Sequence, residues 1–199
     1  MIKVLVSNSK DYVSVPFEIT AQDLAIIFDE LNIGIRQQMN IANDIWENDK
    51  WILERKYRGI RKKKLFLQSV LYQVDYLYHK REIDSSLDAI FENAKELGYQ
   101  VNVASLTEDY SFISEYFKRI WIQLRFLSNT GYTRAKLRTI LDRYNYKRRS
   151  VKFCNYFIEC LNFYKIRPYV KGDLCDIRSI PLDTMVTFKL VTGRKKYLI

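Results

Sequence analysis

Apolar residues recur with a helical period through most of the chain. The clearest example is a single face made of four apolar side chains, Leu24, Ile27, Phe28 and Leu31. Their i, i+3, i+4, i+7 spacing predicts a helix, and Thr20 with Asp23 three residues later is typical of a capping box at its start. Similar patterns predict further helices at about 35–57, 61–80 and 107–127, and one from Asp84 or Ser85 to about Gly98.

Alternating apolar residues predict a few short strands. Residues 2–6 and 13–19 alternate on either side of the polar segment 8–11, which predicts an N-terminal β-hairpin. Residues 99–103 and 186–190 also have strand character. The expected fold class is therefore mainly α with short β-hairpins.

The charge distribution changes near residue 131. Residues 132–199 contain 16 lysines and arginines against 5 acidic residues, whereas residues 1–131 contain 17 against 18. The polar segment Ser128–Gly131 is the best candidate for a linker. We therefore expect two domains, a helical domain at 1–131 and a basic domain at 132–199. A field of this sign favours phosphate polyanions as partners, although excess lysine and arginine can also serve solubility alone.

Two short amphipathic helices predict a helix-turn-helix in the basic domain. The first is expected from a Thr133 cap to about Asn145, and Ser150 is a suitable N-cap for the second. The second helix is expected to have five inward residues: Val151, Cys154, Phe157, Ile158 and Leu161. Its N-terminal end would enter the major groove of DNA. The strand at 186–190 and the basic turn at 192–196 would form a wing.

Most basic residues of this segment are expected on the first helix, in the turn and at the start of the second helix, where they could contact DNA. Lys136 is expected on the first helix. The predicted nucleic-acid-binding residues are Arg134, Arg138, Arg143, Lys147, Arg148, Arg149, Ser150, Lys152, Asn155, Arg194, Lys195 and Lys196. A possible second basic patch comprises Arg58, Arg61, Lys62, Lys63 and Lys64. For both sets the alternative is a solvated turn or helix end.

A stretch of about 50 residues resembles the small winged helix-turn-helix module of restriction and anti-phage defence proteins. The resemblance rests on 137–141, 144–150, Leu161, Pro168, Ile177 and 180–182, with Arg148 and Arg149 at the module's paired arginines. The chain departs from the pattern at Asn145 and Ser150, where the family usually has glycine, and at Phe163 and Tyr164, where it has Gly-Leu. The resemblance implies DNA binding in a defence or restriction setting and says nothing about residues 1–131.

These observations predict a non-enzymatic DNA-binding protein without a cofactor. It would be the DNA-recognition or accessory subunit of a bacterial anti-phage defence or restriction complex, or a regulator. Its partners would be double-stranded DNA, with RNA left open, and a protein partner or second copy bound through residues 1–131. Three cysteines without paired spacing argue against a disulfide framework or a zinc site. We expect a cytoplasmic protein, because the N-terminus does not resemble a signal peptide and no apolar run is long enough for a membrane span.

A Mg²⁺-dependent nuclease is the alternative. Asp44, followed by an apolar strand at 51–53 that ends in Glu54 and Lys56, has the outline of a metal-dependent restriction site. The helical spacing around this segment argues against that interpretation. His79 is the only histidine, and no phosphate-binding glycine motif is present.

Overall fold

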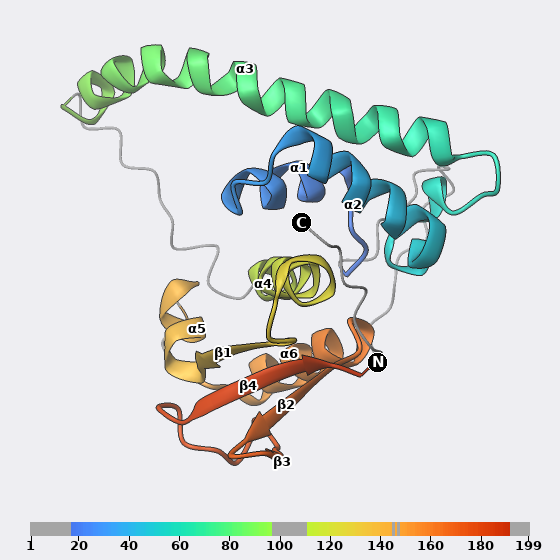
Figure 1. Cartoon of the computed structure of the whole chain (residues 1–199). Helices are drawn as coiled ribbons and strands as arrows, with labels where there is room; N and C mark the ends of the chain where they lie inside the picture. Colours follow the sequence, from blue (N-terminus) through green and yellow to red (C-terminus); the bar gives the residue numbers. More distant parts are fainter. Residues whose placement is uncertain (1–16, 97–110, 145, 147, 192–199) are drawn as a thin grey trace, which may run out of the picture.

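The computed structural model describes residues 17–96, 111–144, 146 and 148–191, except the side chains of 80–96 and 111. The described chain is mainly helical with one small antiparallel sheet, as expected (Figure 1). The α-helices are α1 (Ala21–Glu30), α2 (Ile35–Asn48), α3 (Lys63–Glu96), α4 (Ser111–Ile122), α5 (Leu137–Arg143) and α6 (Val151–Phe163). The strands are β1 (Tyr132–Lys136), β2 (Ile166–Val170), β3 (Asp173–Leu174) and β4 (Met185–Leu190).

The predicted capping box at the start of α1 is confirmed. The Thr20 hydroxyl accepts a hydrogen bond from the Asp23 amide at 2.9 Å, and the Asp23 carboxylate accepts one from the Thr20 amide at 2.8 Å. Two backbone donors that the helix leaves without partners are satisfied in this way. The apolar face of α1 is buried, with Leu24 and Phe28 fully covered.

Two of the predicted helices have different boundaries. The helix expected at 35–57 ends at Asn48, and two 3₁₀ turns follow, η1 (Lys50–Ile52) and η2 (Arg55–Tyr57). The break expected before Asp84 is wrong, because α3 runs without interruption for 34 residues, from Lys63 to Glu96. Aspartate and serine are good caps but also occur inside helices, so their presence does not enforce an end. None of the helices in the described parts of the chain is long and apolar enough to cross a membrane.

Three expected segments lie wholly or mostly outside the described residues: the strand at 99–103, the basic turn at 192–196 and the hairpin at 2–19. Of the hairpin only the last residues are described. Ile19 forms a single parallel bridge with Leu53, and its amide donates to the Ile52 carbonyl at 2.8 Å. The chain before α1 is thereby tied to the segment that follows α2.

The four strands form one antiparallel sheet in the order β1-β4-β2-β3. The strand predicted at 186–190 is confirmed as β4. The helix predicted from Thr133 is wrong in its first turn, because 132–136 pair with β4 as β1 and α5 begins only at Leu137. Thr133 lies opposite Phe188 in this ladder and caps nothing. Tertiary pairing has overridden the local helical pattern of this segment.

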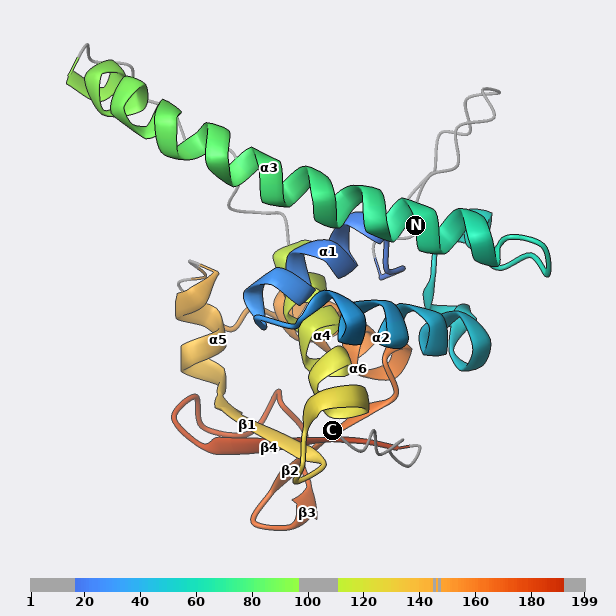
Figure 2. The ribbon, with the colours of Figure 1, turned by 45° about the horizontal axis from the view of Figure 1, so that its top comes forward.

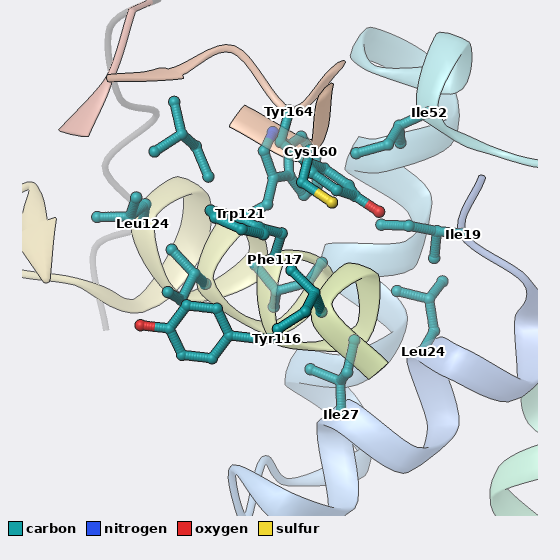
Figure 3. Packing of buried hydrophobic residues seen from close by; sticks show 14 of the residues in the cluster. Ile19, Leu24, Ile27, Ile52, Tyr116, Phe117, Trp121, Leu124, Cys160 and Tyr164 are labelled. Carbon is teal, nitrogen blue, oxygen red and sulfur yellow. The ribbon is translucent and has the colours of Figure 1, made fainter. Parts of the chain in front are cut away.

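A single buried apolar cluster connects the described parts of the chain on both sides of the predicted boundary at 131–132. Phe117 of α4 packs its ring 4.8 Å from Phe157 of α6 and 6.2 Å from Phe188 of β4. Figure 3 shows α4 between the α1 side chains Leu24 and Ile27 and the α6 residue Cys160. The π-helical turn η4 (Gln123–Leu127) links α4 to β1. The residues beyond 131 thus share their core with α4.

Candidate nucleic-acid interface

The two helices of the predicted helix-turn-helix are present as α5 and α6. Ser150 is the N-cap of α6, as predicted, and its hydroxyl accepts a hydrogen bond from the Phe153 amide at 3.1 Å. Cys154, Phe157 and Leu161 are buried as expected. Val151 was predicted to point inward but is 76% exposed, because the first residue of α6 lies beyond the part of the helix that other elements cover.

Arg149 is committed to the fold. Its guanidinium donates hydrogen bonds to the backbone carbonyls of Ile177, at 2.9 Å, and of Ile180. The donor comes from the turn between α5 and α6, and the acceptors come from the connection between β3 and β4. Arg149 therefore holds this connection beside α6, and part of the hydrogen-bonding capacity of its guanidinium is already engaged within the fold.

Arg138 is engaged in a bidentate ion pair. Its Nε and Nη2 atoms donate to the two carboxylate oxygens of Asp183 at 2.6 and 2.8 Å. The hydrogen bond and the positive charge of Arg138 hold the pKa of Asp183 below its ordinary range. Both side chains are exposed, so the pair contributes little stability, but it neutralises a cation that the sequence assigned to DNA binding.

The Arg138–Asp183 pair predicts a pH-dependent stability difference. A carboxylate whose pKa is lowered on folding favours the folded state above its unfolded pKa, about 3.9, and that contribution is lost as the pH falls through the lower folded value. We expect Arg138→Gln to be slightly less stable than the wild type at pH 7 and equally stable near pH 2. Urea unfolding at both pH values measures this difference. Asp183→Asn should behave in the same way, and a deficit that persists at pH 2 would contradict the assignment.

Four residues form an exposed polar surface around the first two turns of α6, which we call the α6 N-terminal face: Arg148, Lys152, Asn155 and Arg178. The first three were predicted from the sequence, and all four are exposed. Arg178 was not predicted. Its guanidinium donates to the Asn155 side-chain oxygen at 3.1 Å, and its amide donates to the Asp176 carboxylate at 2.9 Å. The connection between β3 and β4 thus places a cation beside α6.

The remaining predicted contacts do not belong to this face. Arg134 is exposed on β1, with its guanidinium carbon 4.8 Å from the centre of the Tyr132 ring. Arg143, at the end of α5, lines a cleft of about 450 Å³ between α4, β1 and α5. Lys147, Arg194, Lys195 and Lys196 lie outside the described residues.

The possible second basic patch is divided. Arg58 donates to the Glu18 carboxylate and, at 2.7 Å, to the Leu53 carbonyl, so it holds the segment before α1. Lys63 pairs with Glu47. The other three cations of the patch are exposed: Arg61, Lys62 and Lys64. Only these three are available to a phosphate without first breaking a contact that the structure describes.

The nuclease outline is not supported by the local fold. The strand expected at 51–53 is wrong, because this segment is largely the 3₁₀ turn η1. Burial lowers the pKa of Lys56, but the hydrogen bond and charge of Glu54 outweigh it and raise that pKa overall. The Asp44 carboxylate accepts a hydrogen bond from Asn48 at 2.7 Å. Within the described residues, no cluster of three or more histidine, cysteine or acidic side chains could hold a metal ion.

Comparison of the chain with protein-family models, with curated proteins and with solved structures finds no match.

Proposed function

We propose that this chain is a non-enzymatic protein that binds double-stranded DNA through the α6 N-terminal face. The observation that carries the proposal is the exposed start of α6, where Lys152 and Asn155 project beside Arg178. Lysine and arginine bind phosphates, arginine also reads guanine, and asparagine pairs with adenine. The amides at a helix N-terminus add further phosphate donors.

The distribution of charge along α6 supports an approach of the DNA by the N-terminal end. Lys152 is on the first turn, whereas Glu159 is exposed nearly two turns later. A phosphate is attracted at the start of the helix and repelled further along it. This polarity matches the docking of a recognition helix, whose first residues reach the base edges.

The order of the elements supports a winged-helix module. A helix, α4, precedes strand β1, which is followed by the helix pair α5 and α6 and then by β2 and β4. In the sheet, β4 lies between β1 and β2. In this proposal α4 is the first helix of the module, and the connection at 171–184 between β2 and β4 acts as the wing. That assignment differs from the wing expected at 192–196.

We also propose that the chain works within a larger assembly, as the DNA-recognition or accessory subunit of an anti-phage defence or restriction complex, or as a regulator. The resemblance of the α5–α6 region supports the setting. A protein partner or second copy is supported by five large apolar or aromatic side chains exposed on α3: Leu65, Leu71, Tyr72, Tyr76 and Tyr78. Such an exposed set is typical of an interaction surface.

Binding to a labelled 20-base-pair duplex, followed by fluorescence anisotropy over a range of KCl concentrations, tests the proposed function. Lys152→Ala and Arg178→Ala should each lower the slope of log affinity against log salt by about 0.9, which is the loss of one phosphate contact. Arg36→Ala removes an exposed cation from α2 and is the matched control. The α6 N-terminal face would be the wrong site if the α6 variants and the control gave the same slope as the wild type.

A further inference from the structure

The sheet has one face without a covering element among the described residues. Alternate residues of the strands point to opposite faces, and Ile166, Val186 and Phe188 are buried against the helices. Figure 2 shows α4, α5 and α6 on the same side of the sheet. On the opposite side, Leu174 of the edge strand β3 lies next to Tyr169, and the other three strands contribute Tyr132, Arg134 and Lys136 of β1, Met185, Thr187 and Lys189 of β4, and Arg167 and Tyr169 of β2. We call the eight residues of β1, β4 and β2 the cationic sheet face.

The strand register brings the charges and the rings of this face together. Lys189 lies opposite both Tyr132 and Arg167, and Thr187 lies opposite both Arg134 and Tyr169. The eight outward residues include four cations and no carboxylate. Their like charges repel one another across the ladder. A negatively charged ligand would relieve this repulsion.

Each of the two tyrosines has a cation over its ring on the surface of the sheet. The Arg134 guanidinium carbon is 4.8 Å from the centre of the Tyr132 ring, and the Lys189 ammonium is 5.1 Å from the centre of the Tyr169 ring. Both rings are only half-buried. Aromatic rings and cations together are the groups that bind a nucleic-acid strand with unpaired bases, because a ring stacks on a base while a cation contacts a phosphate. Here a base that stacks on either ring would replace the cation over it, and the long side chain of that cation would turn to a phosphate.

The spacing of the two rings favours a single strand over a duplex. Tyr132 lies opposite Lys189 and Tyr169 lies opposite Thr187, so the two tyrosines are two strands and two residues apart. For strands about 4.8 Å apart and a rise of about 3.4 Å per residue, this separation is about 12 Å. Two bases that stack on these rings must therefore come from nucleotides that are not neighbours. In a duplex the faces of the internal bases are already stacked on one another, so the rings could not reach them.

The cationic surface continues around the edge strand β1. Arg134 and Lys136 also line the cleft of about 450 Å³ between α4, β1 and α5, together with Arg119 and Arg143. Arg119 is paired with Glu30 at 3.6 Å, but none of the residues that line this cleft is acidic. A strand that crosses the sheet can therefore continue along β1 without meeting a carboxylate in the cleft.

We propose that the cationic sheet face binds single-stranded nucleic acid, with bases on Tyr132 and Tyr169 and phosphates on the neighbouring arginines and lysines. This surface shares no residue with the α6 N-terminal face. A chain with both surfaces can hold duplex and single strand together, as at the end of a duplex or at a strand that has been opened. The inference does not rest on duplex binding by α6.

The test uses the full chain and a fluorescein-labelled twelve-residue oligothymidylate. Threonine keeps the β-propensity of the strand but removes the ring. The variants Tyr132→Thr and Tyr169→Thr should each weaken binding about tenfold, whereas Tyr132→Phe and Tyr169→Phe should bind within about twofold of the wild type, because phenylalanine stacks equally well. None of the four should change binding to the 20-base-pair duplex.

An abasic strand of the same length separates stacking from charge. Its affinity should be the same for the wild type and the threonine variants. Arg167→Gln, which replaces an exposed cation, should lower the salt slope for both the oligothymidylate and the abasic strand. The proposal would be overturned if the wild type did not bind oligothymidylate, or if the threonine and phenylalanine variants bound it equally well. It would also be overturned if the threonine variants lost duplex binding in parallel with oligothymidylate binding. Loss of duplex binding in Lys152→Ala alone would concern α6 and not this face.

Discussion

Replacement of Phe157 by alanine should lower the free energy of unfolding by about 3–5 kcal/mol. The Phe157 side chain is fully buried. Its ring centre lies 4.8 Å from that of Phe117, 5.6 Å from that of Phe153 and 6.3 Å from that of Phe188. Truncation removes the transfer free energy of the ring and leaves a cavity among three other aromatic side chains, which cannot collapse without losing their own contacts.

Guanidinium chloride unfolding of Phe157→Ala should be followed by far-UV circular dichroism and by tryptophan fluorescence. All three tryptophans precede residue 131, whereas Phe157 follows it. Because Phe117 joins the two sides of the core, both signals should shift together. Phe112→Ala, at a residue that is 39% exposed, is the matched control and should cost about 1 kcal/mol. If the fluorescence transition stays at its wild-type position, the two parts unfold separately, and the joint core contributes no cooperativity.

The elements that could be predicted from the sequence are those with local determinants. The caps at Thr20 and Ser150 could be predicted because the hydrogen bonds that form them span only three residues. The apolar spacing of α1 is equally local. The segment 132–136 becomes a strand because it pairs with β4, whose residues lie 49 to 57 positions further along the chain. Neither Thr133 nor Ala135 has a local property that identifies this partner. The local pattern therefore predicts a helix for this segment, and that prediction is wrong.

The candidate site was predictable in its location and less so in its residues. Composition and spacing indicate a pair of basic helices, the second of which is capped by Ser150, and both helices are present. The sequence does not show which cations are already engaged. Arg138 meets Asp183 from 45 residues away, and Arg149 meets the Ile180 carbonyl from 31. Arg178 reaches Asn155 over 23 residues. Such pairings depend on tertiary structure, which a charge count does not contain.

The paired arginines of the turn should separate in their effects. Arg149→Ala should lower the free energy of unfolding by about 3 kcal/mol, because hydrogen bonds from a charged donor contribute about 1.5–3 kcal/mol each and are not fully additive. Two carbonyls of the β3–β4 connection lose their donor. Arg148→Ala, at an exposed residue, should stay within about 0.5 kcal/mol of the wild type. Thermal and urea unfolding of the two variants measure the difference.

The same pair distinguishes a structural from a binding role in DNA affinity. At a temperature where both variants are folded, Arg148→Ala should lower the salt slope of duplex binding by about 0.9. Arg149→Ala should leave that slope nearly unchanged, and lower affinity only as far as the β3–β4 connection releases Arg178 from Asn155. Equal stability of the two variants would mean that the carbonyl contacts of Arg149 contribute nothing to the fold. Arg149 would then be available to phosphate on the same terms as Arg148.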